Sequence, residues 1–126
     1  MIDKVDLTKL EDLSMAVMNL ISIEEHLAFT AMKTKKEEYL HVLDSVRNLR
    51  KILLKKLVKN TEGEMWCISK HLLATTMRLM ETSTKYINND TKQALEFAKG
   101  AHDLYSLFWF LQKVGDKDAG RVKRKG

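Results

Sequence analysis

The chain contains no proline, and its 126 residues include only five glycines and one cysteine. Proline interrupts helix interiors and is common in loops, so its absence favours long helices joined by short turns. A single cysteine, Cys67, excludes an intramolecular disulfide and any zinc site built from several cysteines. A reducing compartment is the simplest setting for such a chain, and the sequence therefore predicts a cytoplasmic protein.

Long apolar runs are also missing. No stretch approaches the roughly 18 consecutive apolar residues of a membrane span. Residues 1–13 mix charged and apolar side chains, whereas a secretory signal has a basic segment followed by an apolar one. Neither a membrane span nor a signal peptide is expected. The few glycines are scattered and form no phosphate-binding loop, and no other motif identifies an enzymatic activity.

The sequence does contain strong helical periodicity. Apolar residues make up 44% of the chain, enough for a core, and 31% of residues are charged. Apolar side chains recur every three to four residues in four segments, which is the pattern of amphipathic helices. These segments are residues 7–32, 36–59, 64–87 and 91–114. In the second segment the apolar stripe expected to face the core includes Val42 and Leu49.

The four segments are similar in length and are joined by short links. Each is long enough to span about 36 Å as a helix, and short links favour antiparallel neighbours. Asp90 and Gln93 resemble a capping box at the start of the last helix, and Gly115 is its expected end. We therefore predict an all-α, up-down-up-down antiparallel four-helix bundle over residues 1–114. Residues 115–126 are predicted to form a short, flexible, basic C-terminal tail.

Residues 107–111 read LFWFL and place apolar side chains on every side of the last helix. Part of each helix in a four-helix bundle faces water, so this end has more apolar surface than its own bundle covers, and such patches mark interfaces. The apolar face of the third helix is also wide. These features predict a non-enzymatic protein–protein interaction module, most simply a homodimer, with an unidentified heterologous protein as the other possible partner. The alternative is that the last helix is the central helix of an irregular bundle. The predicted interface residues are Trp66, Leu73, Met77, Met80, Leu107, Trp109, Phe110 and Val114.

Basic residues lie along the second half of the second predicted helix with no acidic residue between them, and more basic residues lie near the C-terminus. The formal net charge is +5. Such a surface can bind phosphates, so nucleic acid is an alternative partner. Cations also favour helix C-termini and form the ordinary outer face of a bundle helix. The candidate phosphate contacts are Arg47, Lys51, Lys55, Lys59, Arg121, Lys123, Arg124 and Lys125. Arg50 lies close to the apolar stripe, and it either pairs with an acidic residue across the bundle or buries its stem and extends its head to water, of which the second is expected.

A third hypothesis is a metal-binding bundle. Glu38-x-x-His41 has the spacing of a ligand pair in carboxylate-bridged di-iron bundles, and Glu25 in the first helix is a candidate carboxylate ligand. The ligand set is incomplete, because no second Glu-x-x-His occurs. The alternative is a solvated face with ordinary ion pairs. Cys67 and His71 also share one side of a helix, where a small thiol beside a surface histidine is the simpler reading. No cofactor is predicted.

Overall fold

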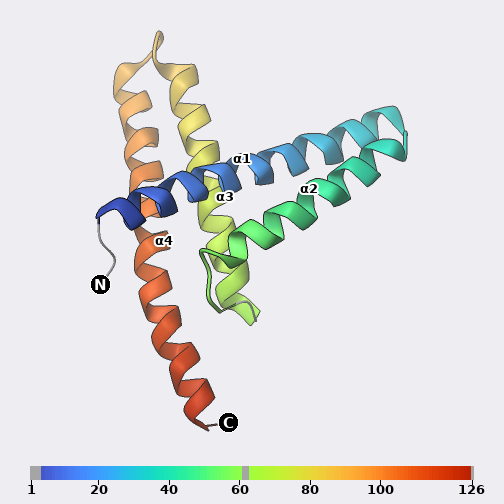
Figure 1. The fold of residues 1–126 in the computed structure, drawn as a ribbon. Coiled ribbons are helices and arrows are strands. Elements are labelled where there is room, and N and C mark those ends of the chain that lie inside the picture. The colour runs from blue at the N-terminus through green and yellow to red at the C-terminus, as the bar shows by residue number, and fades with distance from the viewer. Residues whose placement is uncertain (1–3, 61–62, 126) are drawn as a thin grey trace. The chain divides into compact units, whose positions relative to one another are not determined.

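A computed structural model describes the backbone of residues 4–60 and 63–125, and the side chains of residues 7–60 and 63–114. These residues form four α-helices and no strand: α1 (Lys4–Thr34), α2 (Glu38–Lys55), α3 (Gly63–Tyr86) and α4 (Thr91–Lys125) (Figure 1). The predicted all-α fold with four helices is confirmed. Searched over the same residues, no helix has both the length and the apolar character needed to cross a membrane.

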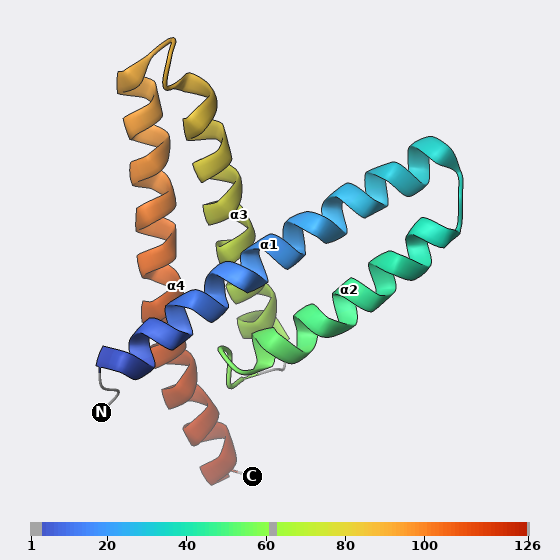
Figure 2. The same ribbon diagram turned by 45° about the horizontal axis from the view of Figure 1, so that its top comes forward.

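The helices pack as two antiparallel hairpins, α1 with α2 and α3 with α4 (Figure 2). The chain divides into two compact units, Met1–Leu57 and Val58–Gly126, and each unit contains one hairpin. The antiparallel packing predicted from the short links is confirmed within each hairpin. The α1–α2 hairpin and the α3–α4 hairpin therefore each have their own set of buried contacts.

The α1–α2 hairpin turns sharply between Thr34 and Glu38. Lys35 adopts a positive φ of 59°, and its backbone N–H donates to the Ala31 carbonyl at 2.8 Å, which ends α1. The backbone N–H of Lys36 then donates to the Thr34 hydroxyl at 3.3 Å. Helix α2 ends at Lys55, earlier than the predicted residue 59. The buried apolar side chains of this unit are Val17, Met18, Ala31, Leu54 and Leu57.

Buried side chains recur regularly on both helices of the α3–α4 hairpin, and all of those named here except Phe108 are small. Ser69, Thr76 and Ser83 recur every seven residues along α3, and Ala94, Ala101 and Phe108 do so along α4. The Ser83 hydroxyl donates to the Ala94 carbonyl at 2.7 Å, so the backbones approach closely there. Near the other end of α3, the Gln112 side-chain amide donates to the Ser69 hydroxyl at 2.9 Å. These two contacts fix the register of the hairpin.

Both ends of α4 bear on predictions from the sequence. The Asp90 carboxylate accepts a hydrogen bond from the Gln93 backbone N–H at 3.1 Å, which confirms Asp90 as the N-terminal cap. Gly115 does not end the helix, contrary to expectation, because α4 continues to Lys125. A glycine inside a helix costs only about 1 kcal/mol relative to alanine. The following residues include no proline, so the helix can continue. The side chains of residues 115–126 lie outside the described set, and flexibility of this tail stays a prediction.

Candidate protein–protein interface on helix α4

Three apolar side chains lie on one side of α4, away from its buried face. Leu107 is 50% exposed, Phe110 is 63% exposed and Val114 is partly exposed. Their spacing of three and four residues places them in one row along the helix. The buried face of α4 is marked by Ala101 and Phe108, which have 1% and 0% exposure. We refer to Leu107, Phe110 and Val114 as the α4 patch.

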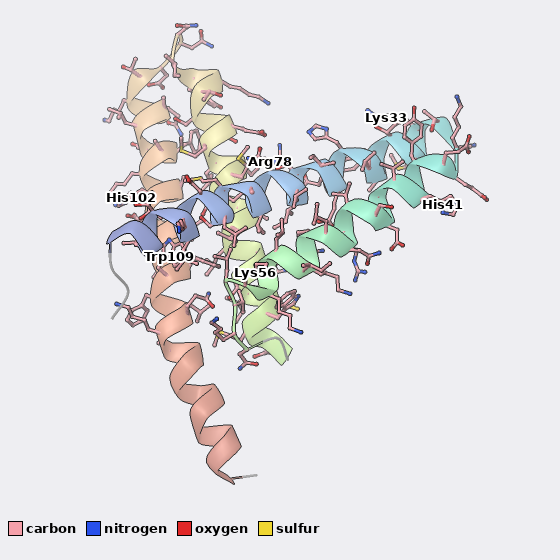
Figure 3. The ribbon with its side chains drawn as sticks, in the orientation of Figure 1. Lys33, His41, Lys56, Arg78, His102 and Trp109 are labelled. Atoms are coloured by element: carbon pink, nitrogen blue, oxygen red, sulfur yellow. The ribbon has the colours of Figure 1, made fainter. Side chains whose placement is uncertain are left out.

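Trp109, labelled in Figure 3, belongs to a different side of α4. It is partly buried, and its ring packs edge-to-face against Phe108 and Tyr105, with centroid distances of 4.9 and 5.9 Å. Consecutive helical residues are about 100° apart, so Trp109 and Phe110 do not form one surface. Trp109 therefore contributes to packing within its own helix, and Phe110 is the one of these two aromatic residues that is exposed.

The predicted contacts on α3 differ in their accessibility. Leu73 is fully buried, so it leaves no exposed side-chain surface for a second chain. It lies four residues after Ser69 and three before Thr76, both of which are buried, and this spacing puts it on the core face. Trp66 and Met77 are partly buried, and Met80 is exposed. Trp66 and Met80 are about 21 Å apart along the helix axis, so the α3 residues do not gather at one point.

The predicted basic contacts on α2 are at the surface. Arg47, Lys51, Lys55 and Lys59 are all exposed, although Lys59 follows the end of the helix. None of them has an ion-pair partner within the described part of the chain. The predicted tail contacts Arg121, Lys123, Arg124 and Lys125 lie in α4, but their side chains are outside the described set. The exposed cations of α2 are therefore the observed part of this surface.

Arg50 is buried and paired, so the expectation that its head reaches water is wrong. Its Nε donates to Glu24 Oε2 at 2.8 Å and its Nη2 donates to Glu24 Oε1 at 2.9 Å. The two side chains are 6% and 13% exposed. The planar guanidinium matches the carboxylate with two parallel hydrogen bonds, which satisfies both groups away from water. This pair connects α1 to α2 and explains why Glu24, an acidic residue, lies on the side of α1 that faces α2.

The residues of the metal hypothesis are not gathered into a site. Glu25, Glu38 and His41 are all exposed, and His41 is labelled in Figure 3. Across residues 7–60 and 63–114, no group of three or more His, Cys, Asp or Glu side chains is placed to hold a metal ion. Cys67 and His71 are also exposed. The described geometry thus gives this hypothesis no support.

Two residues of α2 that the sequence pattern predicts to be buried are exposed in the structure. Val42 and Leu49 are about half exposed, and Ile52 is exposed with them. The apolar residues of α2 occupy more than half of its circumference, and they form two faces, one buried and one exposed. Val42, Leu49 and Ile52 follow each other at intervals of seven and three residues, and this spacing distinguishes the exposed row from the buried face.

The chain was compared with protein-family models, with curated proteins and with solved structures. None of these comparisons found a match. The exposed surfaces of α2 and α4 are therefore the features from which a function can be inferred.

Proposed function

We propose that this protein is a non-enzymatic protein–protein interaction module whose α4 patch binds a second copy of the chain. The observation that carries the proposal is the exposure of Leu107 and Phe110 in one row with Val114. Full burial of such a side chain is worth about 1.5–3 kcal/mol relative to exposure. Phenylalanine is enriched at interface cores, and two-fold homodimers are the commonest assemblies. A self-association surface accounts for this row.

The test is sedimentation velocity on the full chain. Replacing Leu107 and Phe110 together with glutamate should lower the average mass, because charged side chains cannot be buried in an apolar contact. Leu95→Glu is the matched control, since Leu95 is an exposed leucine of the same helix outside the patch. We expect this control to sediment like the wild type. A monomeric wild type at high micromolar concentration, or an unchanged mass for the double variant, would refute the proposal.

Nucleic-acid binding is a second candidate, supported by the exposed Arg47, Lys51 and Lys55 on α2, which have no ion-pair partner among the described residues. Three phosphate contacts on duplex DNA predict a loss of roughly 40-fold in affinity between 50 and 200 mM salt. Fluorescence anisotropy of a labelled duplex measures this loss. Replacing Lys51 and Lys55 with glutamate should abolish the binding, whereas Lys9→Glu on α1 should have little effect. Binding that does not depend on salt excludes this candidate.

A further inference from the structure

Helix α2 carries a second exposed row, separate from the α4 patch. Its members follow each other at alternating intervals of four and three residues, the spacing of a coiled-coil seam. All are exposed, and the three apolar ones are 48–59% exposed. We call this row the α2 seam, and it consists of Glu38, Val42, Ser45, Leu49, Ile52 and Lys56.

The α2 seam is distinct from both other faces of the helix. Arg50 and Leu54 mark the buried face, and about 100° per residue puts the centre of the seam about a third of a turn away from it. Lys51, one of the exposed cations of α2, lies about 140° from the seam in the opposite direction around the helix. The seam is therefore separate from the buried face and from the row of exposed cations.

The residues of the α2 seam are self-complementary, and we propose that it pairs antiparallel with the α2 seam of a second copy. In this arrangement Glu38 lies opposite Lys56 of the second copy, and Val42 lies opposite Ile52. Ser45 then lies opposite Leu49. A two-fold axis repeats each pair, so the Ser45–Leu49 pairs lie at the middle, the apolar Val42–Ile52 pairs flank them and opposite charges close both ends. A parallel arrangement would place Glu38 against Glu38 and Lys56 against Lys56, which like-charge repulsion disfavours.

Local geometry supports this pairing. Lys56 caps α2 in a helical conformation, with φ −72° and ψ −21°, so it continues the row beyond the last helical residue. The Ser45 hydroxyl already donates to the His41 carbonyl at 3.3 Å, and its burial would leave no hydroxyl unpaired. Tyr39, Val46 and Leu53 lie beside the seam and are partly buried. The same two-fold axis brings Val46 against its own copy and Tyr39 against Leu53, which widens the apolar contact.

The charge pattern also distinguishes this partner from an anionic surface. Glu38 lies within the seam itself, where it would repel a phosphate or an anionic lipid headgroup. A second α2 supplies both the aliphatic side chains and the opposite charges that the row requires.

The first experiment is sedimentation equilibrium on full-length protein that carries Leu107→Glu and Phe110→Glu. In this background the association through the α2 seam remains. Adding Leu49→Glu should weaken it by more than about 100-fold, because the substitution buries two unpaired charges per dimer. Leu40→Glu is the matched control, since Leu40 is equally exposed on α2 but about 160° from the seam. This control should associate as tightly as its parent.

The second experiment reverses the charges. Glu38→Lys and Lys56→Glu should each weaken association by about 10-fold, because two attractive pairs become repulsive. The double reversal should restore it to within about 3-fold of the parent. The two residues are 18 positions apart on one helix, so rescue requires contact between copies. Glu37→Lys is the control outside the seam. Helix content by circular dichroism should be unchanged throughout.

The outcomes separate this proposal from the one for the α4 patch. Two self-complementary faces predict a wild-type assembly larger than a dimer, a dimer when either face carries glutamate, and a monomer when both do. If Leu49→Glu leaves the association unchanged, or if the double reversal fails to rescue, the pairing through α2 is overturned while the α4 patch is unaffected. If the pair Leu107→Glu and Phe110→Glu alone has no effect, the α4 patch is rejected and the α2 seam stands. A monomeric wild type rejects both.

Discussion

In the α1–α2 hairpin a buried carboxylate and a guanidinium join the two helices, whereas in the α3–α4 hairpin hydroxyl groups and small side chains bring two backbones together. Glu24 and Arg50 make two charge-assisted hydrogen bonds of 2.8 and 2.9 Å. Ser83 reaches the backbone of the opposite helix with a hydrogen bond of 2.7 Å. Long paired side chains fill the space between separated helices, and small ones require close approach. The two hairpins should therefore respond differently to substitution.

The largest effect is expected from breaking the ion pair of the first hairpin. Arg50→Met should lower the free energy of unfolding by about 3–5 kcal/mol, because it leaves the Glu24 carboxylate buried without its partner. Replacing both Glu24 and Arg50 with methionine should recover most of this loss, since a buried pair can be exchanged for apolar packing. Urea unfolding followed by circular dichroism measures both variants. Arg47→Met, at an exposed position of α2, is the control and should change stability little. A single variant as stable as the wild type would show that the pair is dispensable.

The close approach in the second hairpin is tested by adding volume. Ala101 is buried on α4, and leucine there should destabilise the protein by about 1–3 kcal/mol through overpacking. The same substitution at Ala28, which is exposed on α1, should have little effect. Thermal unfolding compares the two variants. Equal stabilities would mean that the α3–α4 seam has room for larger side chains.

A smaller effect is expected from the hydrogen bond between Ser83 and Ala94. Ser83→Ala removes the hydroxyl that donates across the helices, and the expected loss is about 1 kcal/mol. Thr84→Ala is the neighbouring control, because the Thr84 hydroxyl is exposed and bonds within its own helix to the Glu81 carbonyl. Denaturant midpoints at constant m-value report the difference. If both alanine variants lose the same stability, the cross-helix bond has no special role.

The smallest effect is electrostatic and lies on the surface of α4. The Lys99 ammonium donates to the Asp103 carboxylate at 2.8 Å, and this hydrogen bond lowers the pKa of Asp103 and raises the pKa of Lys99. The contribution of Asp103 to stability is therefore present above its unfolded pKa and is lost as pH falls through its folded pKa. That of Lys99 is present below its unfolded pKa and is lost as pH rises through its folded pKa. Both groups are fully exposed, so solvent screens their interaction.

Lys99→Gln should return the pKa of Asp103 towards its ordinary value, which an NMR titration of the carboxyl group detects. Lys92→Gln, near the start of the same helix, is the control and should leave the Asp103 titration unchanged. An Asp103 pKa that does not respond to Lys99→Gln would show that the ion pair does not persist in solution.

Much of the α4 patch could be predicted from the sequence, because five successive apolar residues must face all sides of a helix. The pattern did not separate Trp109 from Phe110, since both are aromatic and adjacent. Their difference depends on Tyr105 and Phe108, whose rings pack against that of Trp109. Leu73 was assigned to an interface for a similar reason. A wide apolar face shows that several residues need cover, and only the neighbouring helix decides which of them receive it.

The sequence by itself determined the helical class, the number of helices and the antiparallel order within each hairpin, because periodicity, proline content and link length act locally. A β-carbon added at Gly100 would lie 3.4 Å from Leu79 Cδ1, so α3 and α4 approach closely there. Only the tertiary structure decided that Arg50 meets Glu24 and that Val42 and Leu49 face outward. Those outcomes depend on the register and rotation of one helix against another, which residues far apart in the chain fix together.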